Sequence, residues 1–105
     1  MATIKLFFET KQIDLTVAST AYKVYNLRGG EVVLIKAKRA NTGNIFIGDK
    51  DVKTSNGYEL GPGEGIKVKI GEEINSQESI EIYAAASTAG DDVTYFVLPY
   101  YVKIG

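Results

Sequence analysis

Hydrophobic residues recur at every second position in several segments of the chain. In the clearest segment, Ile66, Val68 and Ile70 alternate with Lys67 and Lys69. This spacing puts the apolar side chains on one face of a strand and the lysines on the other. The same alternation covers residues 4–8, 13–17 and 80–84. The pattern predicts half-buried antiparallel strands.

Two further segments are apolar on both faces. They cover residues 32–35, within a longer segment 31–38, and residues 93–98. Such runs are typical of central strands, or of strands that a neighbouring chain covers. Shorter strands are expected over residues 44–47 and 58–60, with a weak one over residues 22–25.

Turn residues separate these segments at regular intervals. Gly-Gly, Asn-Gly and Gly-Pro-Gly sequences occur at residues 29–30, 56–57 and 61–63. Residues 76–86 also fit a capped helix, but the period-two alternation of Ile80 and Ile82 favours a strand. The sequence therefore predicts an all-β chain, a single antiparallel β-sandwich or jelly-roll-like domain of about 7–9 strands over residues 1–105.

The alternation also predicts which side chains face the core of the sandwich. The expected inward-facing residues are Ile13, Leu15, Val33, Ile35, Ile45, Ile47, Ile66, Val68, Ile70, Ile80, Ile82, Val93 and Tyr95.

Charge and hydropathy limit the partners of the chain. The net charge is −1, so the basic excess of a nucleic-acid binder is missing. The short run Lys36, Lys38 and Arg39 is interpreted as protection of a strand edge. The longest mostly apolar stretch, residues 93–102, is too short to cross a membrane as a helix, and the N-terminus has no signal-peptide pattern. We expect no nucleic acid and no membrane as partner, and a chain made and kept in the cytoplasm.

The residue types needed for catalysis are scarce. The chain has no histidine and no cysteine, which removes the usual general base, thiol chemistry and thiolate metal sites. None of the serines lies in a Gly-x-Ser-x-Gly setting. We therefore expect no enzyme activity, no catalytic residue and no cofactor.

Two acidic pairs remain as candidate metal ligands. Asp49 and Asp51 flank Lys50, and Asp91 adjoins Asp92. Carboxylates of this kind suit calcium, but aspartate is equally a common turn residue. Because the first pair has lysines beside it and lacks the ligand spacing of a calcium loop, we interpret both pairs as turns and predict no metal site. The glycine-rich residues 61–65 lack the lysine and hydroxyl residue of a phosphate-binding loop.

Tyrosine is unusually frequent, with seven copies and no tryptophan. Tyr95, Phe96, Tyr100 and Tyr101 lie close together near the C-terminus. An alternating strand cannot direct all of these rings into one core, and exposed tyrosine is typical of interfaces. Two other interpretations stay open: rings packed against sheet edges, and stacking of sugars on aromatic rings.

The middle of the chain contains a recognisable run of strand and turn residues. It reads ANTGNIFIGD at residues 40–49, DV at 51–52 and SNGYELGPGE at 55–64, followed by IEIYA at 80–84 and VTY at 93–95. This run resembles small structural proteins encoded in the head and tail gene clusters of tailed bacteriophages and prophages. The resemblance covers roughly residues 31–98, and residues 1–30 and 98–105 depart from it.

The resemblance implies a virion structural protein, in the first place a head decoration or cementing protein bound to the major capsid protein. A tail or neck component is the alternative in the same class. A carbohydrate-binding or adhesin module is the alternative in another class, with Tyr58, Tyr83, Tyr100 and Tyr101 as stacking rings and calcium held by Asp49 or Asp51. The localisation implied is the virion, assembled in the host cytoplasm.

Both chain ends are expected to contact another subunit. Adjacent Phe7 and Phe8 point to opposite faces of a strand, and Pro99 cannot donate to a strand ladder. Residues 1–10 and 99–105 are therefore predicted contact arms of a homo-oligomer, while pairing of the two ends within one subunit is the alternative. A trimer is what the resemblance and lattice symmetry imply. The predicted interface residues are Phe7, Phe8, Phe96, Tyr100, Tyr101 and Val102.

Overall fold

The computed structural model describes residues 9–69 and 79–99, and these residues form strands and turns without a helix. The eight strands are β1 (Glu9–Leu15), β2 (Tyr22–Arg28), β3 (Glu31–Ala37), β4 (Ile45–Gly48), β5 (Tyr58–Leu60), β6 (Gly65–Lys69), β7 (Ser79–Ala86) and β8 (Asp91–Pro99). The prediction of an all-β sandwich is confirmed. The helical interpretation of residues 76–86 is wrong where it can be compared, since residues 79–86 form β7.

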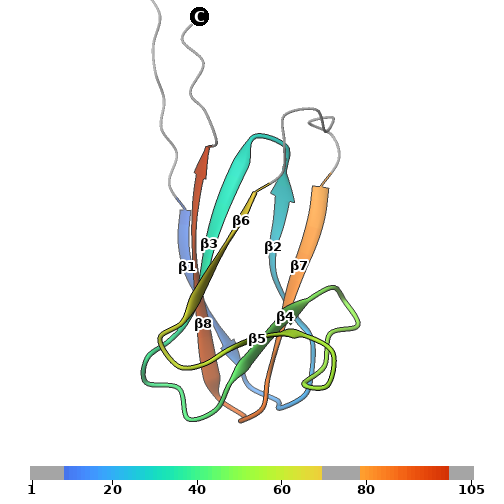
Figure 1. Ribbon diagram of the computed structural model, residues 1–105, viewed down its shortest axis with the longest axis vertical. Helices are drawn as coiled ribbons and strands as arrows, with labels where there is room; N and C mark the ends of the chain where they lie inside the picture. Colours follow the sequence, from blue (N-terminus) through green and yellow to red (C-terminus); the bar gives the residue numbers. More distant parts are fainter. Residues whose placement is uncertain (1–8, 70–78, 100–105) are drawn as a thin grey trace, which may run out of the picture.

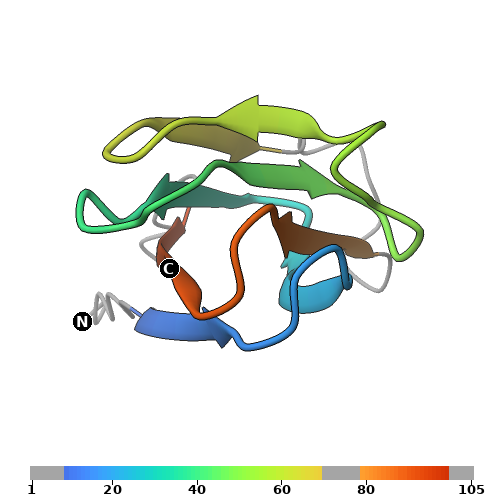
Figure 2. The same ribbon diagram turned by 90° about the horizontal axis from the view of Figure 1, so that it is seen from below.

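The strands form two antiparallel sheets of four strands each. The first sheet has the order β1-β8-β3-β6 and the second the order β2-β7-β4-β5. The consecutive strands β4 and β5 pair within one sheet. All the remaining connections between consecutive strands pass from one sheet to the other (Figures 1 and 2). This order is that of a jelly roll, which is also described as a double-stranded β-helix.

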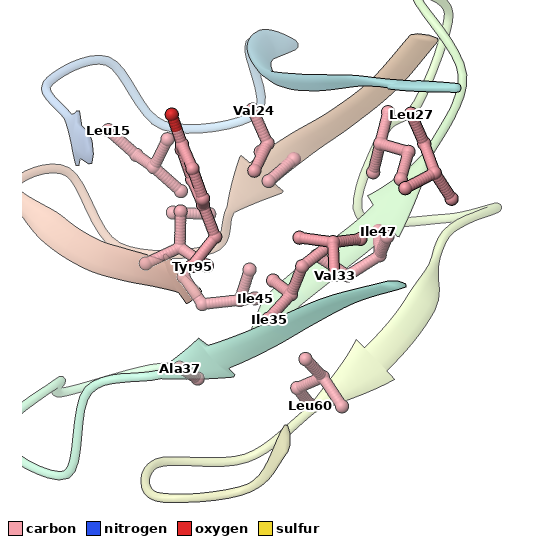
Figure 3. Packing of buried hydrophobic residues seen from close by; sticks show 14 of the residues in the cluster. Leu15, Val24, Leu27, Val33, Ile35, Ala37, Ile45, Ile47, Leu60 and Tyr95 are labelled. Atoms are coloured by element: carbon pink, nitrogen blue, oxygen red, sulfur yellow. The ribbon is translucent and has the colours of Figure 1, made fainter. Parts of the chain in front are cut away.

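The hydrophobic core lies between the two sheets (Figure 3). Its largest fully buried side chains are Leu15, Leu27, Val33, Ile35, Ile45 and Val93. Of the predicted inward-facing residues, those buried are Leu15, Val33, Ile35, Ile45, Ile47, Ile82, Val93 and Tyr95. Ile13, Ile66 and Val68 are partly buried against this core, and Ile70 lies outside the described residues.

The prediction that Ile80 belongs to the buried core is wrong. Its register partner on β2 is Leu27, which is fully buried, so Ile80 has the expected inward phase. Yet the side chain is 50% exposed. The strand β4 ends opposite Tyr83, so among the described strands the first residues of β7 pair with β2 alone. Ile80 therefore lacks the cover that a neighbouring strand on its other side would give.

The alternation over residues 13–17 also stops earlier than expected. The strand β1 ends at Leu15, and Val17 is 56% exposed in the following loop. The Val17 amide donates to the Tyr22 hydroxyl at 3.0 Å, not to a neighbouring strand. The chain turns here toward the second sheet, and Ser19 takes a positive φ of 57° within that turn.

The strand β2 is longer than the weak segment expected over residues 22–25. Its register against β7 shifts between Lys23 and Tyr25, which leaves Val24 as a bulged residue. Val24 and Leu27 are both buried, three positions apart. A bulge breaks the period-two pattern, and this explains why the sequence indicates β2 so weakly.

Several strands begin or end at one end of the sandwich. The strand β1 begins there and β8 ends there, with Glu9 opposite Val97. Figure 1 shows the end of β6, the beginning of β7 and the β2–β3 turn at this same end.

In the part of the chain that is described, no helix is long and apolar enough to cross a membrane.

Candidate interaction surface

The recognisable run at residues 40–49 begins with a clamp between two distant turns. Asp91 is buried, and its carboxylate accepts hydrogen bonds from the Thr42 amide at 3.0 Å and the Gly43 amide at 2.8 Å. Asn41 bonds the backbone of Asp92 in both directions, each at 2.8 Å. The segment joining β3 to β4 is thus fixed to the turn between β7 and β8.

Close packing at this clamp requires a glycine. A Cβ atom at Gly43 would lie 2.4 Å from Ser87 Oγ and 2.5 Å from Thr88 Oγ1. The neighbouring Asn44 amide donates to Ser87 Oγ at 3.0 Å. The Asn-Thr-Gly-Asn sequence therefore acts as a structural joint.

The loop between β4 and β5 covers the outer face of its own sheet. Phe46 and Ala85 are register partners on that face, and Ala85 is fully buried. A Cβ atom at Gly57 would lie 2.6 Å from Phe46 Cβ and 2.7 Å from Val52 Cγ2. Since Val52 is 3% exposed, the loop closes a small apolar cluster against the second sheet.

The first acidic pair serves this loop. Asp49 Oδ1 accepts the Asp51 amide at 2.9 Å, and Asn56 Oδ1 accepts the Lys53 amide at 2.7 Å. A hollow of about 270 Å³ is lined by Gly48, Asp49, Val52 and Asn56. Over the described residues, no group of three or more acidic side chains is arranged to hold a metal ion.

The Gly-Pro-Gly-Glu segment is also a turn. Glu64 Oε1 accepts the Gly61 amide at 2.5 Å, and the Gly63 amide donates to the Ala37 carbonyl at 2.9 Å. Gly63 has a φ of +85°, a conformation that favours glycine. The run that carries the resemblance thus consists of parts of β4, β5, β7 and β8 together with the turns that fix these strands to one another.

The outer face of the first sheet carries an apolar patch on its two central strands. In the β3–β8 register, Leu34 lies opposite Phe96 and Val32 lies opposite Leu98. Their sequence neighbours Val33, Ile35, Tyr95 and Val97 are buried on the inner face. Leu34 is 38% exposed and the other three are half-buried. We call Val32, Leu34, Phe96 and Leu98 the outer patch.

The sequence signal for the outer patch is the pair of segments that are apolar on both faces. These two segments form β3 and β8, which are the neighbouring central strands of the first sheet. The interpretation of the two segments as central strands is therefore confirmed. Phe96 was expected at an interface, whereas Val32, Leu34 and Leu98 were missed as site residues. The two strands lie far apart in the sequence, so the sequence alone does not indicate that these residues share one surface.

The other predicted interface residues lie outside the described part of the chain. These are Phe7, Phe8, Tyr100, Tyr101 and Val102. What the structure shows is that residues 9 and 99 belong to adjacent antiparallel strands. Both predicted arms therefore start from the same end of the first sheet.

The two described tyrosines of the sugar-stacking alternative lie on opposite faces of the second sheet. Tyr58 is the register partner of Ile47, which faces the core, and is 56% exposed on the edge strand β5. Tyr83 is the register partner of Gly48 and has the opposite phase. The two rings therefore do not form one stacking platform.

The buried Tyr95 and the partly buried Tyr25 join four strands across the sandwich. The rings of Tyr25 and Tyr95 lie 5.3 Å apart between centroids and are tilted by 46°. The Tyr25 hydroxyl donates to Glu31 Oε2 at 2.9 Å, and the Tyr95 hydroxyl donates to the Glu9 carboxylate. Burial, followed by the bonded carboxylate, raises the pKa of Tyr25 well above its ordinary value and the pKa of Tyr95 to about 12. The two hydroxyl groups thus link β2 to β3 and β8 to β1.

Three of the four edge strands of the described sheets carry features that oppose the addition of another strand. These edges are β1 and β6 in the first sheet and β2 and β5 in the second. The strand β2 has its bulge, β5 has 3 residues, and β6 alternates with Lys67 and Lys69. Bulges, short strands and charged side chains all disfavour edge-to-edge pairing. The face of the first sheet is therefore the better candidate for an interaction.

Comparison with known proteins supports the fold. No protein-family model matches the chain, and no curated protein matches it. Among solved structures, it is similar to a de novo designed double-stranded β-helix, with 16% identity, a TM-score of 0.50, and coverage of 88% of this chain and 96% of that one. It is also similar to a structure from work titled "Bacillus endospore appendages form a novel family of disulfide-linked pili", with 13% identity, a TM-score of 0.48, and coverage of 94% and 92%. The likeness to the designed protein agrees with the jelly-roll strand order and concerns the fold alone.

Proposed function

We propose that this chain is a virion structural protein, specifically a head decoration or cementing protein that binds the capsid lattice. The observation that carries the proposal is the outer patch, an apolar surface on the two central strands of a sheet. Large apolar side chains at such positions are typical of protein interfaces. On this proposal the chain acts by binding and has no catalytic role.

The turn framework supports the same proposal. The residues that resemble phage structural proteins make hydrogen bonds and close contacts within the fold, for example between Asp91 and the amides of Thr42 and Gly43. A rigid scaffold that presents a face suits a cementing protein. Jelly rolls also occur in viral capsid and lectin domains, which is an analogy at the level of the fold.

The proposed partners are the major capsid protein and further copies of this chain. In this proposal, residues 1–10 and 99–105 are the arms that join subunits into a trimer on the lattice. Pairing of the arms within one subunit is the competing arrangement, and the adjacency of β1 and β8 is compatible with both.

The experiment is cosedimentation of the full chain with empty capsid shells. The proposal requires a major capsid protein among the products of the neighbouring genes, and the shells are assembled from that protein. The expected result is saturable binding with a fixed ratio of this chain to capsid protein, as lattice sites require. Neighbouring genes without any virion protein, or shells that sediment without the chain, would contradict a role on the head. Binding to purified tails in place of shells would instead assign the chain to a tail or neck.

A further inference from the structure

The charges beside the outer patch are positive. In the register of the first sheet, Lys67 lies opposite Leu34, and Lys36 lies opposite Thr94 one step further along the same face. Both lysines are exposed. Among the residues that the structure describes, neither makes a salt bridge, whereas Lys23 pairs with Glu81 at 3.1 Å on the other sheet.

The acidic residues of the same face lie at its other end. Asp14 and Asp92 are register partners near the turn that precedes β8. Between them and the patch, Lys38 donates to Gln12 Oε1 at 2.8 Å. The outer patch is therefore apolar at its centre and flanked by cations on the β3–β6 side.

The outer faces of the two sheets differ in how far other residues cover them. The second sheet covers Phe46 and Ala85 with the loop between β4 and β5, and Ala85 has no exposed surface. On the first sheet Leu34 keeps 38% of its surface exposed between Phe96 and Lys67. Since three of the four described edge strands carry features that oppose strand addition, we take the side chains of that face as the contact surface.

We propose that the first sheet docks face-on against a protein surface with an apolar centre and carboxylates beside it. This inference rests on the proposed function and assigns the capsid-binding face and the chemistry of the capsid site. The outer patch supplies the buried apolar area, and Lys36 and Lys67 pair with the partner's aspartates or glutamates. An apolar centre provides affinity, while charges at the rim provide orientation and fast association.

The charge complementarity selects an acidic protein in preference to a nucleic acid. A polyanion would attract the lysines but offers no apolar surface for Leu34 and its neighbours. The two classes of partner therefore differ in how binding depends on Leu34. Both would show binding that weakens with salt.

The test is cosedimentation with the same capsid shells, using the full chain and matched variants. The double variant Lys36→Glu/Lys67→Glu reverses the charges beside the patch, and Lys50→Glu/Lys53→Glu makes the same charge change in the exposed β4–β5 loop. Leu34→Asp places a charge in the patch, and Val17→Asp does so at an exposed apolar residue elsewhere. Circular dichroism verifies that each variant keeps the fold.

We expect the Lys36/Lys67 variant to bind at least about tenfold more weakly than the unaltered chain, and the Lys50/Lys53 variant to bind within about twofold. Leu34→Asp should lose about tenfold or more, with little change for Val17→Asp. Raising the salt from roughly 50 mM to roughly 500 mM should weaken the unaltered chain and bring the Lys36/Lys67 variant closer to it. If Leu34→Asp does not fold, the two lysine variants and the salt series decide the question.

Zero-length carbodiimide coupling adds a direct readout. It should join Lys36 or Lys67 to an aspartate or glutamate of the capsid protein, identified by mass spectrometry. Equal binding by the Lys36/Lys67 and Lys50/Lys53 variants, without such a crosslink, would overturn the assigned face but leave capsid binding intact. Loss of binding in the lysine variant with full binding by Leu34→Asp would show that charge alone carries the binding, and would overturn the apolar centre of the assigned face. Shells that fail to bind the unaltered chain would remove the proposed function and this inference together.

Discussion

Asp91 has the role of a fixed acceptor within the fold. It is 6% exposed, and both carboxylate oxygens accept backbone amides from the segment after β3. We predict that Asp91→Ala lowers the free energy of unfolding by about 1–3 kcal/mol, because two partly buried hydrogen bonds, from the Thr42 and Gly43 amides, are lost. Urea denaturation measures the change. Asp14→Ala, at an exposed position, should stay within about 0.5 kcal/mol, and an equal loss in both variants would contradict the clamp.

Gly43 is limited by space. We predict that Gly43→Ala costs about 1–3 kcal/mol of stability, because the new methyl group would displace Ser87 and Thr88. Thermal unfolding followed by circular dichroism tests this. The exposed neighbour substitution Thr42→Ala keeps the backbone amide that Asp91 accepts and should change little. A Gly43→Ala variant as stable as the unaltered chain would show that the two turns are not in close contact.

Tyr25 and Tyr95 predict a loss of stability in strong alkali. The ordinary tyrosine pKa is 10.0, and the folded chain raises that of Tyr95 to about 12 and that of Tyr25 further. The unfolded chain therefore loses these protons first, so the stabilisation is complete below pH 10 and falls as the pH rises from 10 toward 12. Urea midpoints across this range should decline, and less steeply in Tyr95→Phe. Identical slopes in both chains would contradict the buried pair.

Single residues could be assigned as turn formers from the sequence, but their partners could not. Asn41, Gly43 and Asp91 are recognisable turn residues by type. Thr42 and Asp91 are 49 positions apart, and the contact between them depends on how the strands pair. For the same reason the sequence indicated Val32 and Leu34 as parts of a two-faced strand but not as neighbours of Phe96.

The strands themselves were predictable where the alternation is regular. The segments expected over residues 58–60 and 66–70 correspond closely to β5 and β6. The pattern was least informative at β2, where the bulge at Val24 shifts the phase, and at Ile80, where the phase is right but the neighbouring strand is too short. Burial depends on what covers a strand, which its own sequence does not contain.

Truncation tests the predicted C-terminal arm. A chain ending at Leu98 keeps every register pair between β1 and β8 and loses the pairing of Pro99 with Glu31. We predict that it retains its β-type circular dichroism spectrum but has a lower oligomer mass in light scattering, because it lacks residues 99–105, the proposed contacts between subunits. A chain ending at Lys103 retains Tyr100, Tyr101 and Val102 and is the control. Unchanged mass after the longer truncation would favour arms that pair within one subunit.

At the scale of the whole molecule, the sandwich class followed from the spacing of strands and turns, whereas the pairing order did not. Nearly all strand neighbours in the described chain are distant in sequence, such as β1 with β8 and β3 with β6. Periodicity reports the faces of each strand but carries no information on which strand lies beside it. The jelly-roll order is what brings β3 and β8 together and so creates the outer patch.

We propose that this chain binds a capsid lattice through the first sheet. The most direct measurement is an electron cryomicroscopy reconstruction of purified particles carrying the full chain. We expect density for the sandwich at symmetric lattice positions, with Leu34, Phe96 and Lys67 facing acidic and apolar residues of the capsid protein. A particle that lacks this density would contradict binding to the capsid, and one that binds the chain with the first sheet turned to solvent would contradict the assigned face.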